Sequence, residues 1–210
     1  MKFTKKLSII VCSLTTAFLS TAVITNTYKS AVQAQTEGQE LIINGGFETD
    51  PLADINDPNI VNSNVTAWVK SGEPIDILGV TISNFPHTGN QGLSLGSFSG
   101  ISYIAQTIPT IPGQHYQLTY YFASIEEAPN LKNKFKVFIG GKKVSVKKDT
   151  PYQPYTQYTL DFKAKATSTE IKFGSKAKYA FLYLDDVSVK ATSEHQGENY
   201  GDEVIDDGDD

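Results

Sequence analysis

Tyrosine and amide side chains on strand-like segments are the residues of this chain best suited to hold a ligand. Tyr121 and Gln117 alternate with Phe122, and Tyr103 alternates with Ile104, so all three should point away from a core. Rigid aromatic rings beside amides suit sugars, which have apolar faces and polar edges. We expect Tyr103, Gln117 and Tyr121 to line one shallow ligand-binding groove. The alternative is that these tyrosines only pack across strands, as tyrosine does in many sheets.

Catalytic patterns are absent from the sequence. None of the three histidines belongs to a nucleophile, zinc or phosphate-loop motif. A glycosidase needs two carboxylates that face each other across a cleft. The acidic candidates Asp76, Glu126, Glu127 and Asp161 show no such pairing in the sequence. We therefore expect a chain that is not an enzyme.

The cysteine and arginine content of the sequence argues against thiol chemistry and nucleic-acid binding. The single cysteine, Cys12, lies in an apolar N-terminal run, so a chain processed after Ala34 has no thiol for disulfides, metal binding or catalysis. All 18 basic residues are lysines, and the net charge is −5. Nucleic-acid binding is disfavoured, because there is neither a basic excess nor an arginine for bidentate contacts.

The elements that position these candidate residues are predicted to be strands. Apolar residues alternate with polar ones in four segments, namely 116–122, 135–139, 158–162 and 171–173. Turn signals separate such segments at Gly89-Asn90, Ser99-Gly100, Pro112-Gly113 and Gly140-Gly141. About nine or ten short strands at this spacing indicate an all-β fold, an antiparallel β-sandwich or barrel.

The two ends of the chain differ from this middle part. Residues 1–34 read as a signal peptide, with a retained anchor as the alternative, so we expect a secreted, periplasmic or extracellular protein with no membrane span after cleavage. Residues 193–210 carry eight of the 23 acidic residues and few apolar ones, which predicts a disordered tail that solubilises the chain or binds cations or a partner. Residues 35–192 remain as one β-sandwich domain, which we expect to be monomeric.

Two motifs near the ends of this domain resemble a known family. One is the Asn-Gly-Gly-Phe-Glu sequence at 44–48, and the other is the Asp-Asp-Val-Ser-Val sequence at 185–189. Trp68 and the segments 89–95, 104–107 and 112–118 follow in the expected order between them. The chain thereby resembles jelly-roll carbohydrate-binding modules of the CenC-like type and related galactose-binding-like and choice-of-anchor domains of bacterial exported proteins. The resemblance implies a two-sheet sandwich whose first and last strands meet.

The resemblance also implies a structural calcium ion. Its ligands here would be the carbonyls of Gly46 and Gln91 and the carboxylates of Glu48 and Asp185. Calcium takes such oxygen ligands, and it would relieve the repulsion between the two carboxylates. Thr88 stands where the similar modules have a further acidic ligand, which removes one charge from the site. The alternative is that Glu48 and Asp185 only cap strand ends or pair with lysines.

The sequence therefore predicts an exported, non-catalytic module that binds an extracellular or envelope glycan. A structural or protein-interaction component of the envelope or matrix is the alternative, because sandwiches host many functions.

Overall fold

The computed structural model describes residues 38–52, 64–73, 79–125 and 132–192. The predicted signal peptide, the acidic tail and most of the irregular segment 49–66 lie outside these residues. In the described part of the chain every regular element is a strand, and none of it forms a helix long and apolar enough to cross a membrane.

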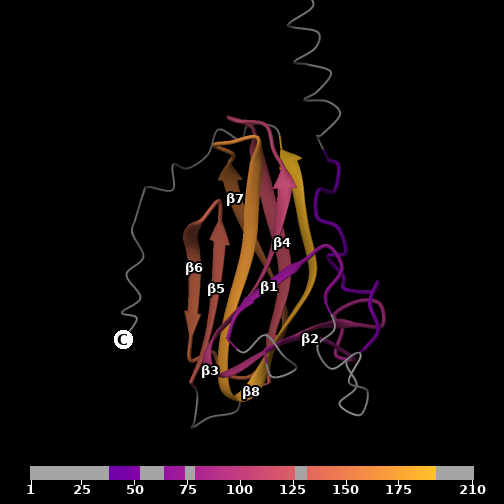
Figure 1. Cartoon of the computed structure of the whole chain (residues 1–210), viewed down its shortest axis with the longest axis vertical. Helices are drawn as coiled ribbons and strands as arrows, with labels where there is room; N and C mark the ends of the chain where they lie inside the picture. Colours follow the sequence, from indigo (N-terminus) through magenta and orange to yellow (C-terminus); the bar gives the residue numbers. More distant parts are fainter. Residues whose placement is uncertain (1–37, 53–63, 74–78, 126–131, 193–210) are drawn as a thin grey trace, which may run out of the picture. The chain divides into compact units, whose positions relative to one another are not determined.

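Eight strands make up the described domain (Figure 1). They are β1 (Val69–Gly72), β2 (Val80–Ser83), β3 (Gly92–Pro109), β4 (His115–Ser124), β5 (Asn133–Ile139), β6 (Lys142–Lys148), β7 (Gln153–Lys163) and β8 (Ser168–Thr192). All pairings between them are antiparallel.

The two longest strands, β3 and β8, take part in both layers of a β-sandwich. The first layer has the order β2, β3 start, β8 end, β4 and β7. The second layer has the order β1, β3 end, β8 start, β5 and β6. This arrangement confirms the predicted antiparallel two-sheet fold.

The predicted turn at Ser99-Gly100 is wrong. These residues lie inside β3, where its pairing with β8 shifts register between Leu95 and Ser102. Bulges of this kind bend a strand and increase its twist, which lets β3 continue from one layer into the other. One long strand therefore replaces two predicted short ones, and the described residues hold eight strands rather than nine or ten.

The core follows the alternation seen in the sequence. Tyr116, Leu118, Tyr120 and Phe122 of β4 are all buried between the layers. The inward residues of β5 and β8, with Trp68 and Phe47, complete this core. Tyr158, Leu160 and Phe162 of β7 are half-buried and pack against it, as expected for a strand at the edge of the first layer.

Two local features of the prediction are also confirmed. Gly140 and Gly141 join β5 to β6 with φ values of 57° and 80°, which a tight hairpin turn requires at both central residues. The start of the domain lies beside its last strand, since Glu40 pairs with Lys190 and the Leu41 amide donates to the Val189 carbonyl at 3.0 Å.

Candidate functional site

The outer face of the first layer carries a row of polar side chains along β4. Tyr121, Thr119 and Gln117 point outward there, because the residues between them are buried. Across to β7, Gln117 donates a 2.9 Å hydrogen bond to Asp161, and the Tyr121 hydroxyl donates one of 3.1 Å to Gln157. The structure thus places Gln117 and Tyr121 on one face.

Tyr103 lies elsewhere, so the predicted groove that it shares with Tyr121 is wrong. It belongs to the β3 end in the second layer, where it is opposite Ser71 of β1 and Gly174 of β8. Its ring lies 6.1 Å from that of Phe138 on β5. Alternation showed that both tyrosines point outward, but it carries no information on which of two layers a strand joins.

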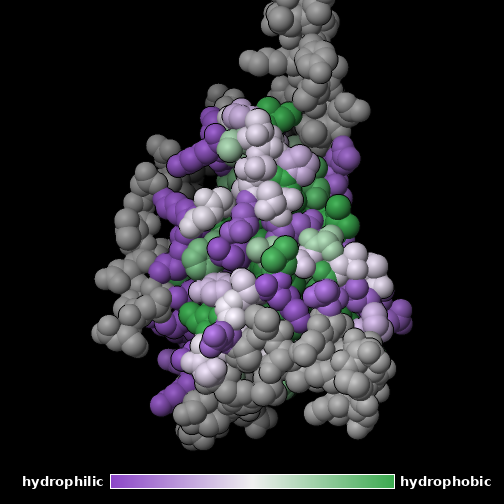
Figure 2. Space-filling view, viewed as in Figure 1, coloured by the Kyte–Doolittle hydropathy of each residue, from purple (hydrophilic) through white to green (hydrophobic). Residues whose placement is uncertain are grey.

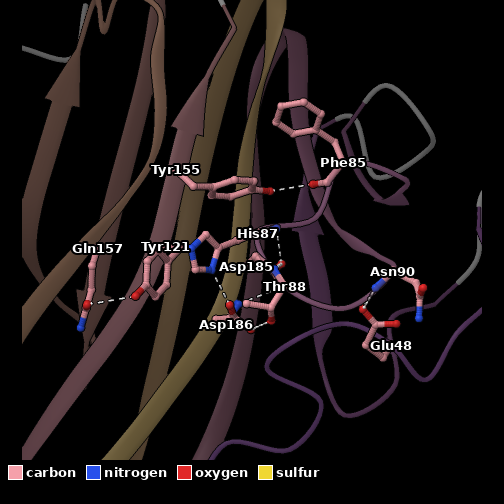
Figure 3. A network of polar contacts seen from close by, with 10 residues as sticks. All are labelled: Glu48, Phe85, His87, Thr88, Asn90, Tyr121, Tyr155, Gln157, Asp185 and Asp186. Carbon is pink, nitrogen blue, oxygen red and sulfur yellow. Dashed lines mark hydrogen bonds and ion pairs between the residues drawn. The ribbon is translucent and has the colours of Figure 1, made fainter.

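The loop that contains the predicted Gly89-Asn90 turn completes the face of the first layer, and its two rings were not among the predicted site residues. Residues 84–91, here called the 84–91 loop, connect β2 to β3 and place two rings over the sheet (Figure 3). The His87 ring stacks on Tyr121 with a centroid distance of 3.6 Å and an angle of 16°. Phe85 stacks on Tyr155 of β7 at 5.8 Å and contacts Tyr183 of β8 at 4.5 Å.

These five rings, Phe85, His87, Tyr121, Tyr155 and Tyr183, form what we call the aromatic cluster. Phe85 is 43% exposed, so the cluster offers an apolar surface to solvent. The Tyr155 hydroxyl donates a 2.7 Å hydrogen bond to the Phe85 carbonyl and fixes the loop to β7. Burial, followed by the negative charges of Asp185 and Asp186, raises the pKa of Tyr155, so this hydroxyl stays protonated.

Two adjacent carboxylates on β8 hold the 84–91 loop in place. Asp185 accepts hydrogen bonds from the backbone amides of His87 at 2.7 Å and Thr88 at 3.3 Å. Asp186, at a bulge with φ of 48°, contacts His87 Nδ1 at 2.6 Å and accepts a hydrogen bond from the Thr88 hydroxyl at 2.8 Å. Since His87 stacks on Tyr121, these contacts also set the position of the aromatic cluster.

Asp185 is fully buried, and burial is the main reason that its pKa rises from 3.8 to about 6. Hydrogen bonds from the amides of His87, Asp186 and Thr88 favour the charged form and limit this rise. A nearby cation stabilises the charged form of a buried carboxylate of this kind, because it compensates for the solvation that the carboxylate loses on burial.

The four residues of the predicted calcium site come from three distant parts of the chain and lie near one another. A Cβ built on Gly46 would lie 4.0 Å from Asp185 Oδ1 and 4.0 Å from Glu48 Cγ. Glu48 in turn accepts hydrogen bonds from the amides of Asn90 and Gln91 at 2.7 and 2.8 Å.

The donor types at this place fit calcium. Both amide bonds to Glu48 use Oε1, which leaves Oε2 available to a cation. Within the described ranges, no group of three or more His, Cys, Asp or Glu side chains is placed to hold a metal ion. A site here would therefore depend on backbone carbonyls in addition to its two carboxylates, as calcium sites often do.

Comparison with known proteins places the chain in a family. The model described as "Protein of unknown function (DUF642)" matches residues 40–190, which is nearly the whole described domain. This chain belongs to the DUF642 family. No curated protein matches the sequence of this DUF642 chain.

Solved structures with the same fold include carbohydrate-binding modules. The chain is similar to TmCBM61 in complex with β-1,4-galactotriose, with a TM-score of 0.53 and 13% identity over 74% of this chain and 100% of the other. It is also similar to the enzymatically active domain of tailspike protein 4 of bacteriophage CBA120, with a TM-score of 0.51, 16% identity and coverage of 73% and 21%. A xylan-binding domain from CBM 22 has a TM-score of 0.49, 12% identity and coverage of 74% and 95%. The first two of these likenesses, with TM-scores above 0.5, show the jelly-roll fold of this DUF642 domain.

Proposed function

We propose that this DUF642 chain is an exported, non-catalytic glycan-binding module whose binding face is the outer face of the first layer. The observation that carries the proposal is the aromatic cluster beside the polar row of β4 and β7. Phe85 and His87 present ring surfaces, with His87 stacked on the half-buried Tyr121. Gln117, Asp161 and Gln157 present hydrogen-bonding groups on the same face. A sugar chain needs this combination, because its rings have apolar faces and hydroxyl edges.

The fold supports the same conclusion by analogy. Among the similar structures, one module was solved with β-1,4-galactotriose and another is described as xylan-binding. A shared fold does not transfer a ligand, but it suggests which ligands to test first. β-1,4-Galactan and xylan are therefore the first neutral polysaccharides to test.

Calcium is the second part of the proposal. Glu48 and Asp185 would hold the ion with the carbonyls of Gly46 and Gln91. The ion would supply positive charge between two carboxylates that also anchor the 84–91 loop. Calcium should raise the melting temperature, and a chelator should lower it. At a concentration about 100-fold above Kd, a ligand adds about 2.7 kcal/mol of stability, which is easily measured. An unchanged melting curve in excess chelator would remove calcium from this account.

The carboxylates near the aromatic cluster already form hydrogen bonds within the fold, which argues against a catalytic role. Asp185, Asp186 and Glu48 bind amides or side chains of the 84–91 loop, and Asp161 accepts a hydrogen bond from Gln117. A hydrolase screen on common polysaccharides should therefore show no turnover, and product release from any of them would contradict this part of the proposal.

The direct test is retention of the purified protein on immobilised polysaccharides, with calcium and with chelator. Selective retention on one neutral glycan would support the proposal. Absence of retention on all of them would favour the alternative, a structural or protein-interaction component of the envelope or matrix.

A further inference from the structure

The 84–91 loop is held at two points by the two carboxylates of the predicted calcium site. Four backbone amides of the loop donate to these carboxylates, namely those of His87, Thr88, Asn90 and Gln91. Asp185 accepts the first two hydrogen bonds, and Glu48 accepts the last two. Between the two points lies Gly89, where an added Cβ would be 2.2 Å from Glu48 Oε1. The separation between the two carboxylates therefore constrains the conformation of the loop.

The same contacts continue from Asp185 to a ring of the aromatic cluster. Besides the two loop amides, the Asp185 carboxylate accepts a hydrogen bond of 2.7 Å from the Asp186 amide. The Asp186 carboxylate contacts the His87 ring, which stacks on Tyr121. Both the backbone and the ring of His87 are therefore placed through Asp185. A displacement of the Asp185 carboxylate would move a ring of the proposed glycan face.

Binding at the proposed glycan face depends on where the loop places its rings. On the side of the molecule seen in Figure 2, the hydrophobic side chains of the described residues occur in small groups among hydrophilic ones. On a surface of this kind a few well-placed side chains supply most of the binding free energy. Phe85 and His87 both belong to the 84–91 loop, so the conformation of the loop decides whether their rings are in place.

From these contacts we infer that calcium regulates the glycan face by fixing the 84–91 loop, an inference that rests on the proposed function. Without a cation, the carboxylates of Glu48 and Asp185 repel each other, and each can move together with the part of the loop that it holds. An ion bound by both carboxylates removes this repulsion and fixes their separation. The loop is then held in the conformation that stacks His87 on Tyr121.

The size of the effect follows from the fraction of molecules whose loop is in the binding conformation. A site that is in this conformation about one tenth of the time binds its ligand about tenfold more weakly than a site that is always in it. We therefore expect calcium to lower the Kd for the glycan by about tenfold. Because the coupling between two ligands is reciprocal, the glycan should lower the Kd for calcium by the same factor.

Two matched variants separate the ion from the hydrogen bonds of the loop. Glu48→Gln keeps an amide oxygen that can accept both hydrogen bonds now made by Oε1, and it replaces the other oxygen with an NH₂ group that cannot bind a cation. Glu40→Gln is the control. Glu40 Oε1 likewise accepts hydrogen bonds from two amides, those of Ile42 and Val189 at 2.9 Å, but neither amide belongs to the 84–91 loop.

The first readout is amide hydrogen exchange of the purified protein in calcium and in chelator. Calcium should slow exchange of the four loop amides in the native protein and in Glu40→Gln, and it should leave them unchanged in Glu48→Gln. Magnesium at the same concentration controls for ionic strength. The second readout is affinity electrophoresis in β-1,4-galactan and in xylan. Calcium should lower the Kd about tenfold for the native protein and Glu40→Gln, but not for Glu48→Gln.

Loop amides that exchange equally fast in calcium and in chelator would overturn the inference, and so would equal calcium effects in the two variants. Retention on a polysaccharide that does not change with calcium would contradict this inference alone and leave the proposed function in place. Slower exchange of the loop amides without retention on either polysaccharide would contradict the proposed function instead, while the dependence of the loop on the ion would stand. Melting curves of each variant check that it folds.

Discussion

Tyr155 connects the proposed binding loop to the sheet through a single hydroxyl group. It donates to the Phe85 carbonyl at 2.7 Å, while its ring stacks on Phe85. The variant Tyr155→Phe keeps the ring and removes the hydrogen bond. We expect a loss of about 1 kcal/mol in the free energy of unfolding at neutral pH, measured by urea denaturation.

The same variant makes a prediction about pH. The pKa of Tyr155 is raised above 10 in the folded state, so its contribution to stability is fully present below pH 10 and is lost as pH rises towards the folded pKa. The difference in free energy of unfolding between the native protein and Tyr155→Phe should therefore become smaller above pH 10. The exposed Tyr152→Phe serves as the control for alkaline effects. If this difference stays constant up to the highest pH at which the protein remains folded, the result would contradict the burial of this hydroxyl.

Alanine variants of two adjacent glycines, Gly45 and Gly46, test how the first segment of the domain packs on β8. A Cβ at Gly45 would lie 1.9 Å from the Val187 carbonyl oxygen, whereas a Cβ at Gly46 meets nothing closer than 3.7 Å. Gly45→Ala should therefore cost about 2 kcal/mol or more in thermal or urea unfolding, because backbone must move. Gly46→Ala should cost much less. Equal effects of the two variants would show that the segment does not dock on β8 in this way.

At the scale of elements, the sequence predicted structural features that depend on residues close together in the chain. It missed those that depend on contacts between residues far apart in the chain. Alternation identified the buried face of β4 and the outward position of Tyr121, and the Gly140-Gly141 pair identified a hairpin. The layer of Tyr103 and the role of His87 were not predictable, since His87 meets Asp185 and Asp186 across almost a hundred residues of sequence. The family resemblance predicted that Gly46, Glu48, Gln91 and Asp185 lie near one another, whereas it did not predict that Asp185 and Glu48 bind amides of the 84–91 loop.

At the scale of the whole domain, a single aromatic core supports both outer faces. Phe135 is fully buried and stacks on Phe122 at 4.4 Å and on Phe173 at 5.9 Å. Phe135→Ala should therefore cost about 3–5 kcal/mol in unfolding experiments. Phe85→Ala, in the exposed aromatic cluster, should cost far less stability but should weaken glycan retention. A stability loss as large for Phe85→Ala as for Phe135→Ala would mean that Phe85 is part of the core and not of a binding face.

The measurement that tests the central claim most directly is binding of neutral polysaccharides, beginning with β-1,4-galactan, to the native protein, Tyr121→Ala and Tyr103→Ala. The two variants remove the same side chain from opposite layers, so each is the control for the other. The account predicts that the native protein binds one of these glycans, that Tyr121→Ala weakens binding by about tenfold or more, and that Tyr103→Ala leaves it unchanged. Equal loss in both variants, or binding to none of the glycans, would contradict it.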